Sequence, residues 1–88
     1  MMTAVPALAP RDAADDSAEF LAGLGRRVRD ARARRGLSRK ALSLEARVSE
    51  RYLAQLEAGE GNASVVLLRR VAVALGATLP ELLCESSP

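Results

Sequence analysis

The sequence predicts an all-α domain, and three observations lead to this prediction. About half of the 88 residues are apolar, which is enough for the core of one small domain. Gly and Pro are few in the middle of the chain and runs of β-branched residues are nearly absent, so strands are not favoured. Apolar residues recur there at helical spacing. Because the chain has one Phe, one Tyr and no Trp, the core must be built from Leu, Val and Ala.

The predicted domain covers residues 17–84. Residues 1–16 are rich in Ala, Pro and Asp and show no apolar periodicity, so they are expected to be a disordered lead-in. Residues 85–88 are expected to be a short tail.

Two helices are expected in the first half of the domain. The first, 18–34, would begin after the N-cap Ser17 and end before Gly36. One face of it is rich in arginine, and the inward face carries Phe20, Leu21, Leu24, Val28 and Ala31. Ser38 would cap a short second helix over 39–46. The inward residues of this helix are expected to be Ala41, Leu42 and Ala46.

A third helix is expected over about 49–58, after a brief turn that contains Arg47 and Val48. Ser49 would act as its N-cap, and Gly59 would supply its C-terminal stop. A helix this short is not stable alone in water, so it must be held by its apolar side. That side consists of Leu53 and Leu56, with Val48 beside them.

A fourth helix is expected to follow its N-cap Ser64 and to end at Gly76, and Thr78 and Pro80 would open a last short helix in "PELL". The inward stripe of the fourth helix is predicted to be Val65, Leu68, Val71, Ala72 and Leu75. A surplus of apolar residues, which usually marks an interface, remains at Val66, Leu67, Val73, Leu79 and Leu82. We expect this surplus either to form the two-fold interface of a homodimer or to dock a further domain.

The charge of the chain is strongly segregated, although its net charge is only +2. Between Arg26 and Arg51 there are ten basic and three acidic residues, a net charge of +7, whereas residues 1–19 carry −3. Such a positive region in a small domain points first to a polyanion, most commonly nucleic acid. The alternative is a solvated basic face.

Other classes of function are poorly supported. The chain has no His and only one cysteine, Cys84, so imidazole catalysis, zinc-finger spacings and an internal disulfide are excluded. No nucleophile–base pair, paired carboxylates or metal-ligand cluster is readable, so we expect neither an enzyme nor a cofactor or metal. No stretch is long and apolar enough for a bilayer span or resembles a secretory signal, and a cytoplasmic location is the default.

The second and third helices carry the motif that points to a function. Two short helices joined by a turn of about three residues, the second with an exposed polar N-terminal edge, make a helix-turn-helix. Residues 24–83 resemble the Cro/CI-like (XRE-type) family of phage and bacterial transcription regulators. The resemblance rests on Val28-Arg29, Arg32, Gly36-Leu37-Ser38, Leu42, Val48-Ser49, Leu53, Leu56-Glu57, Gly59, Ser64, Leu68, Val71-Ala72 and Leu75-Gly76. It implies a compact five-helix, lambda-repressor-like domain that binds double-stranded DNA.

The N-terminal edge of the third helix is the predicted reading head in the major groove. Arg51 has a fork suited to guanine, and Gln55 is suited to adenine. Glu50 either accepts a hydrogen bond from cytosine, orients Arg51, or only interacts favourably with the helix N-terminus. Tyr52 either touches a thymine methyl or a phosphate, or packs on the surface. Ser49 completes the set of base-reading candidates.

Phosphate contacts are expected at the N-termini of the second and fourth helices. Arg39 stands where the resembled family usually has a Gln that binds a backbone phosphate, so the resemblance implies the same role. Arg47 stands where that family commonly has Gly, so either the turn differs or Arg47 is kept for a phosphate contact. The candidates are Arg39, Lys40, Arg47, Asn62 and Ser64, the last of which is also explained as a cap.

One pair of charged residues has an expected structural role. In the resembled family an Arg on the first helix reaches the Glu at the end of the recognition helix, which implies an ion pair between Arg32 and Glu57. This pair would fix the third helix to the first.

A narrower resemblance and a rival function complete the predictions. The stretch VSERYLAQLEAGEGNASV resembles the N-terminal domain of benzoyl-CoA-responsive regulators, which implies a C-terminal effector domain in a longer protein. The rival function is a protein-interaction module, such as an antitoxin-like partner with the same fold. The surplus apolar residues fit this alternative, but the arginine-dense first half does not require it.

Overall fold

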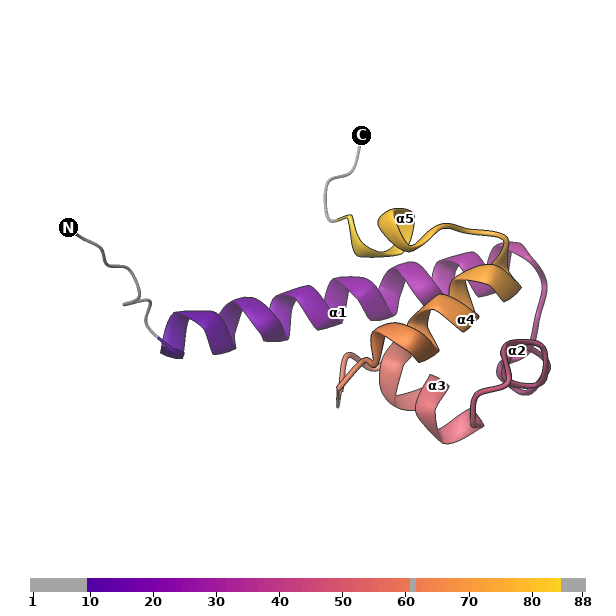
Figure 1. Cartoon of the computed structure of the whole chain (residues 1–88), viewed down its shortest axis with the longest axis horizontal. Coiled ribbons are helices and arrows are strands. Elements are labelled where there is room, and N and C mark those ends of the chain that lie inside the picture. Colours follow the sequence, from indigo (N-terminus) through magenta and orange to yellow (C-terminus); the bar gives the residue numbers. More distant parts are fainter. Residues whose placement is uncertain (1–9, 61, 85–88) are drawn as a thin grey trace.

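The computed structural model describes residues 10–60 and 62–84. These residues form five α-helices, namely α1 (Pro10–Arg34), α2 (Arg39–Ala46), α3 (Glu50–Glu57), α4 (Val65–Leu75) and α5 (Leu79–Leu83). The first turns of α1 extend beyond the other helices, and α3 and α5 lie on opposite sides of α1 in the view of Figure 1. The predicted all-α fold is confirmed. None of the helices in these described residues is long and apolar enough to cross a membrane.

Hydroxyl caps begin four of the helices at the predicted positions. Ser38 and Ser49 each accept a hydrogen bond from the backbone N–H three residues later, at 3.0 and 2.9 Å. Ser64 makes the same contact at 3.4 Å, and Thr78 forms a reciprocal capping box with Glu81. Each such cap contributes about 1 kcal/mol. Local sequence therefore determines where α2 to α5 begin.

The first helix is longer than predicted. It begins at Pro10, so Ser17 lies inside the helix and is not its cap, and the expected disordered lead-in is helical over residues 10–16. Pro is tolerated at the first position of a helix because its missing N–H would have no partner there. The rest of the predicted lead-in, 1–9, and the tail 85–88 lie outside the described residues.

The core lies between all five helices and is aliphatic, as predicted. Its members are Leu24, Val28, Ala31, Leu42, Ala46, Leu53, Leu56, Leu68, Val71, Ala72, Leu75 and Leu82. The prediction that Val65 belongs to the inward stripe of α4 is wrong, because Val65 is 68% exposed. Val65 is the first residue of α4 and precedes the part of the helix that packs on the core, which begins at Leu68.

The residues that were expected to form an interface differ in how far they are exposed. Leu82 is 2% exposed and belongs to the core, because α5 packs against both α1 and α4. Its predicted place in an interface is therefore wrong. Leu67 and Leu79 are half-buried, and only Val66 and Val73 are well exposed, at 62% and 71%.

The turn between α2 and α3 places an arginine in the left-handed conformation. Arg47 has φ 60° and ψ 45°, and it is the only non-glycine residue with positive φ in the described parts of the chain. Its carbonyl oxygen accepts a hydrogen bond from Arg70 Nη1 at 3.3 Å. The turn thus has the conformation that a glycine would adopt without steric cost, and an L-residue there costs about 1–2 kcal/mol.

Arg47→Gly is therefore expected to raise the stability of the fold. Gly loses more entropy on folding but removes the steric cost, so the net gain should be about 1 kcal/mol. In thermal unfolding of a domain this small, such a gain raises Tm by about 4–8 °C. Arg47→Ala is the control, because it removes the same side chain, keeps the strain and should show no gain. A clear fall in Tm for Arg47→Gly would refute the strained-turn interpretation.

Candidate nucleic-acid interface

α3 separates an apolar seam from a polar edge within eight residues. Leu53 and Leu56 are buried on the side that faces the domain. Arg51 and Gln55 lie on the opposite side, and they are exposed together with Ser49 and Glu50 at the N-terminal end of the helix. We call these four residues the α3 edge. Residues four positions apart in a helix share a face, so Arg51 and Gln55 point the same way.

Tyr52 does not belong to the α3 edge. It is half-buried against the core, and its hydroxyl oxygen is buried without a hydrogen-bond partner among the described residues. Burial raises the pKa of the Tyr52 phenol, because the charged form would lose its hydration. The structure therefore contradicts the prediction that Tyr52 reads bases. It lies one turn before Leu56 in α3, on the inward side, and its hydroxyl does not reach solvent.

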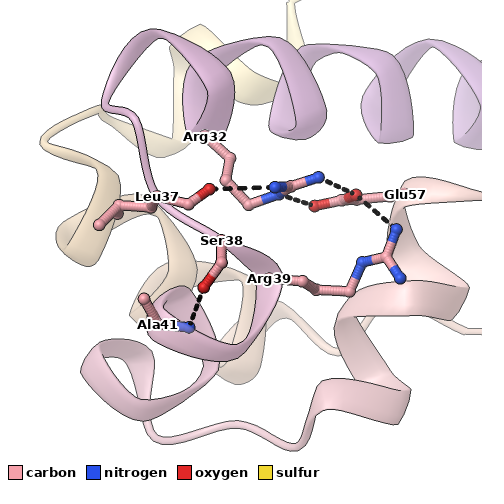
Figure 2. Close-up of polar contacts among 6 residues, drawn as sticks. All are labelled: Arg32, Leu37, Ser38, Arg39, Ala41 and Glu57. Atoms are coloured by element: carbon pink, nitrogen blue, oxygen red, sulfur yellow. Dashed lines mark hydrogen bonds and ion pairs between the residues drawn. The ribbon is translucent and has the colours of Figure 1, made fainter.

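Glu57, the last residue of α3, is held by an arginine of α1. Arg32 donates from Nε to Glu57 Oε2 at 2.7 Å and from Nη2 to Oε1 at 2.9 Å, as Figure 2 shows. It also donates from Nη1 to the Leu37 carbonyl at 3.0 Å. The hydrogen bond to Glu57 raises the pKa of the Arg32 guanidinium, although burial opposes it. Two parallel hydrogen bonds between planar groups fix both the position and the orientation of the end of α3.

Arg39 approaches the same carboxylate from the first residue of α2. Its Nη2 lies 3.4 Å from Glu57 Oε1 (Figure 2). The Glu57 side chain is 3% exposed, whereas that of Arg39 is 46% exposed. Glu57 thus joins α1, α2 and α3 at one point. We call Arg32, Arg39 and Glu57 the Glu57 cluster.

Gly25 sets the distance between α1 and α3. A Cβ atom at this position would lie 2.5 Å from the Leu56 carbonyl oxygen and 2.6 Å from that of Glu57, much closer than atoms in contact. Sequence reasoning missed this residue. The available signal was a glycine inside an amphipathic helix, which costs about 1 kcal/mol relative to Ala and therefore usually has a packing or functional reason.

The model of the helix-turn-helix family matches residues 28–82. The chain belongs to this family. ClgR, the clp gene regulator of Corynebacterium glutamicum, is similar to it at 38% identity and a TM-score of 0.70, over 75% of this chain and 85% of that one. C.AhdI, the restriction-modification controller protein of Aeromonas hydrophila, has 32% identity and a TM-score of 0.68, over 70% and 94%. No curated protein matches the chain.

The predicted phosphate contacts of this helix-turn-helix domain lie in different surroundings. Lys40 at the start of α2 is exposed. Arg47 is tied through its backbone to α4, as described above. Asn62, in the loop before α4, lines a groove with Phe20 and Leu79. Ser64 is occupied as the cap of α4. Arg39 donates a hydrogen bond to Glu57 of α3.

Proposed function

We propose that this helix-turn-helix protein regulates transcription by placing α3 in the major groove of double-stranded DNA. One observation carries the proposal. The α3 edge is exposed, while the last residue of the same helix is buried and locked to α1 and α2 by the Glu57 cluster. A reading helix must keep its orientation, because its side chains read base edges through directional hydrogen bonds.

The α3 edge offers a small set of groups for reading bases. Arg51 presents a planar fork that matches the two acceptors of guanine, and Gln55, one turn later, matches adenine. Glu50 lies in the first turn of α3, where a negative charge is favourable to the helix and where it is able to accept from cytosine. Ser49 already uses its hydroxyl oxygen as the N-cap, so its contact with DNA would come from the hydroxyl hydrogen.

Arg39 is the phosphate contact with the strongest support. The Glu57 cluster contains two guanidinium groups and one carboxylate, so it carries one surplus positive charge. Arg32 is mostly buried, and the half-exposed Arg39 makes only a single, long hydrogen bond to Glu57. Its other N–H donors are suited to a phosphate oxygen. We propose the same role for the exposed Lys40, Arg47 and Asn62 and for the N-terminus of α4 at Ser64.

Arg51→Ala and Arg39→Ala are expected to weaken DNA binding in different ways. With a sequence selected from a random DNA pool, Arg51→Ala should lose about 1–3 kcal/mol of discrimination at one base position. Arg39→Ala should weaken binding to all sequences alike and reduce the salt slope of log K by about 1. Fluorescence anisotropy at several salt concentrations measures both quantities.

Arg34→Ala is the matched control for this experiment. Arg34 is an exposed cation in the last turn of α1, and nine residues, or two and a half helical turns, put it on the side of α1 opposite Gly25 and α3. It should leave both the discrimination and the salt slope unchanged. If Arg51→Ala and Arg39→Ala behave identically on selected and random DNA, the assignment of the α3 edge is wrong.

We further propose that the protein binds DNA as a homodimer. An apolar groove of about 410 Å³ between α1, the start of α4 and α5 contains Phe20, Leu21, Leu79 and Leu83, and no charged residue lines it. Two copies are therefore able to meet there without charge repulsion. A two-fold dimer would place two α3 edges about one DNA turn, or roughly 34 Å, apart.

Leu83→Lys is expected to abolish this dimer in sedimentation equilibrium. The substitution puts a charge into an apolar contact, where its desolvation is unfavourable. Val73→Lys, at an exposed site that does not line this groove, should leave the dimer intact. A monomeric wild-type protein at high concentration would overturn the proposal.

The narrower resemblance supports a more specific role. On the stretch VSERYLAQLEAGEGNASV we propose that the domain acts in the cytoplasm beside an effector domain that binds an acyl-CoA ligand, as in benzoyl-CoA-responsive regulators. Binding of benzoyl-CoA to the native protein from its own cells would support this proposal, and its absence would count against it.

A further inference from the structure

A second groove lies between the end of α2 and the exposed side of α4. It measures about 610 Å³, and we call it the α2–α4 groove. Its apolar surface comes mainly from Val65, Val66 and Val73 of α4, which are 68%, 62% and 71% exposed. None of the α3 edge residues lines it.

The exposed valines have no role in holding the fold. The inward stripe of α4 is complete without them, since Leu68, Val71, Ala72 and Leu75 are buried. Val66 and Val73 lie on the other side of the helix, and Val65 is exposed because it precedes the part of α4 that packs on the core. Valine is also a poorer helix former than alanine or a long polar residue, because its side chain loses rotamer freedom in a helix. Exposed apolar side chains gathered in one groove are therefore best explained by a binding partner.

The charges around the groove decide what kind of partner fits. Arg47, Arg69 and Arg70 line it, against the single acidic residue Glu45, which leaves a net charge of +2. Arg70 is braced across the groove, because it donates a hydrogen bond to the Arg47 carbonyl. A second copy of this chain would bring like charges together. This distinguishes the α2–α4 groove from the uncharged groove beside α5.

We propose that the α2–α4 groove binds an acidic amphipathic segment of a partner protein. Apolar side chains of the segment would lie on the valines, and its carboxylates would pair with the guanidinium groups at the rim. The groove shares no residue with the α3 edge, although it contains Arg47, which we also propose as a phosphate contact. The partner would therefore leave the base-reading residues free and would compete with DNA only at Arg47. Such a contact would let a DNA-bound regulator recruit another protein.

The proposal is tested with a phage-displayed library of random peptides selected on the wild-type protein. The selected peptides should combine Asp or Glu with large apolar residues, and their affinity should fall as salt is raised. The double variant Val66→Ser/Val73→Ser should weaken binding of a selected peptide on the order of tenfold or more. Arg69→Glu/Arg70→Glu should do the same through charge.

Leu44→Ser is the matched control, because Leu44 is 71% exposed but does not line the groove. It should leave peptide affinity unchanged. All these variants change exposed side chains, and thermal unfolding should show that each one folds.

Four outcomes would overturn the proposal. One is that the selected peptides lack acidic residues, and another is that the valine variant binds them as tightly as the wild type. In a third, the arginine variant loses DNA binding while peptides do not compete for the site. The last would make the groove a surface for the DNA backbone. Loss of self-association in the valine variant would instead make it the dimer interface. None of these results depends on the base-reading role of the α3 edge, which Arg51→Ala tests separately.

Discussion

Gly25→Ala is expected to destabilise the domain and to weaken its specific binding to DNA. Ala is a better helix former than Gly by about 1 kcal/mol, so a substitution judged on the helix alone should stabilise α1. The added Cβ would instead lie 2.5 and 2.6 Å from two carbonyl oxygens of α3. Backbone atoms cannot rotate away as side chains do, so α1 and α3 must separate. We expect a net loss of about 1–3 kcal/mol, as for other overpacked sites.

Gly23→Ala is the matched control, since it lies in the same helix two residues earlier. A Cβ at Gly23 would meet only Nη1, at the end of the Arg27 side chain, at 3.1 Å. This atom needs to shift by only a few tenths of an ångström, which the side chain is able to do while its Nε still donates to the Leu82 carbonyl. This variant should therefore be at least as stable as the wild type in urea unfolding. The test is that Gly25→Ala lowers the free energy of unfolding, whereas Gly23→Ala leaves it unchanged or raises it. Equal stabilities would show that the close approach at Gly25 does not constrain α3.

The DNA readout separates a positioning role for Gly25 from a purely structural one. If Gly25 sets the orientation of α3, the folded fraction of Gly25→Ala should bind a selected sequence more weakly but should keep its affinity for random DNA. Measurements well below the midpoint of unfolding isolate this fraction. A loss of affinity that follows only the unfolded fraction would assign Gly25 to stability alone.

Features that depend on neighbouring residues in the chain could be predicted from the sequence. The caps at Ser38, Ser49 and Ser64 need only the first turn of their own helix. The place of Arg47 in the motif left open whether the turn differs from that of the family, and the structure shows the left-handed conformation. The buried stripes of α1 to α3 follow from their apolar spacing. The polar, exposed character of the α3 edge follows from the same pattern.

Features that depend on how helices distant in the sequence pack against each other could not be predicted in this way. Whether Leu82 faces inward depends on how α5 docks on α1 and α4, because a single helical turn is too short to show a period. Val65 obeys the periodicity of its helix but lies where the helix has not yet reached the core. The burial of Tyr52 depends on how α3 docks on the core, and the need for a glycine at position 25 depends on the distance between α1 and α3. This distance is a property of two helices, and neither helix shows it alone.

Glu57→Gln is expected to destabilise the domain by about 3 kcal/mol. The substitution keeps the shape of the side chain but removes its charge, and Arg32, whose side chain is only 17% exposed, would lose its counter-ion. Removal of one partner of a buried pair typically costs about 3–5 kcal/mol, because the remaining charge is left without compensation. The lower end applies because the Gln oxygen still accepts one hydrogen bond. Thermal unfolding should show a fall in Tm of more than about 10 °C.

Arg39→Ala and the double variant Arg32→Met/Glu57→Met complete this test. Arg39 is half-exposed, so its contact with Glu57 is worth less than about 1 kcal/mol, and its removal should change Tm little while it weakens DNA binding. The double variant replaces the pair by apolar side chains of similar length and should recover most of the stability lost in Glu57→Gln. If it is instead less stable than Glu57→Gln, the pair contributes through its own attraction and not through the cost of one stranded charge. If it is stable but loses DNA specificity, the ion pair serves to orient α3 rather than to stabilise the fold.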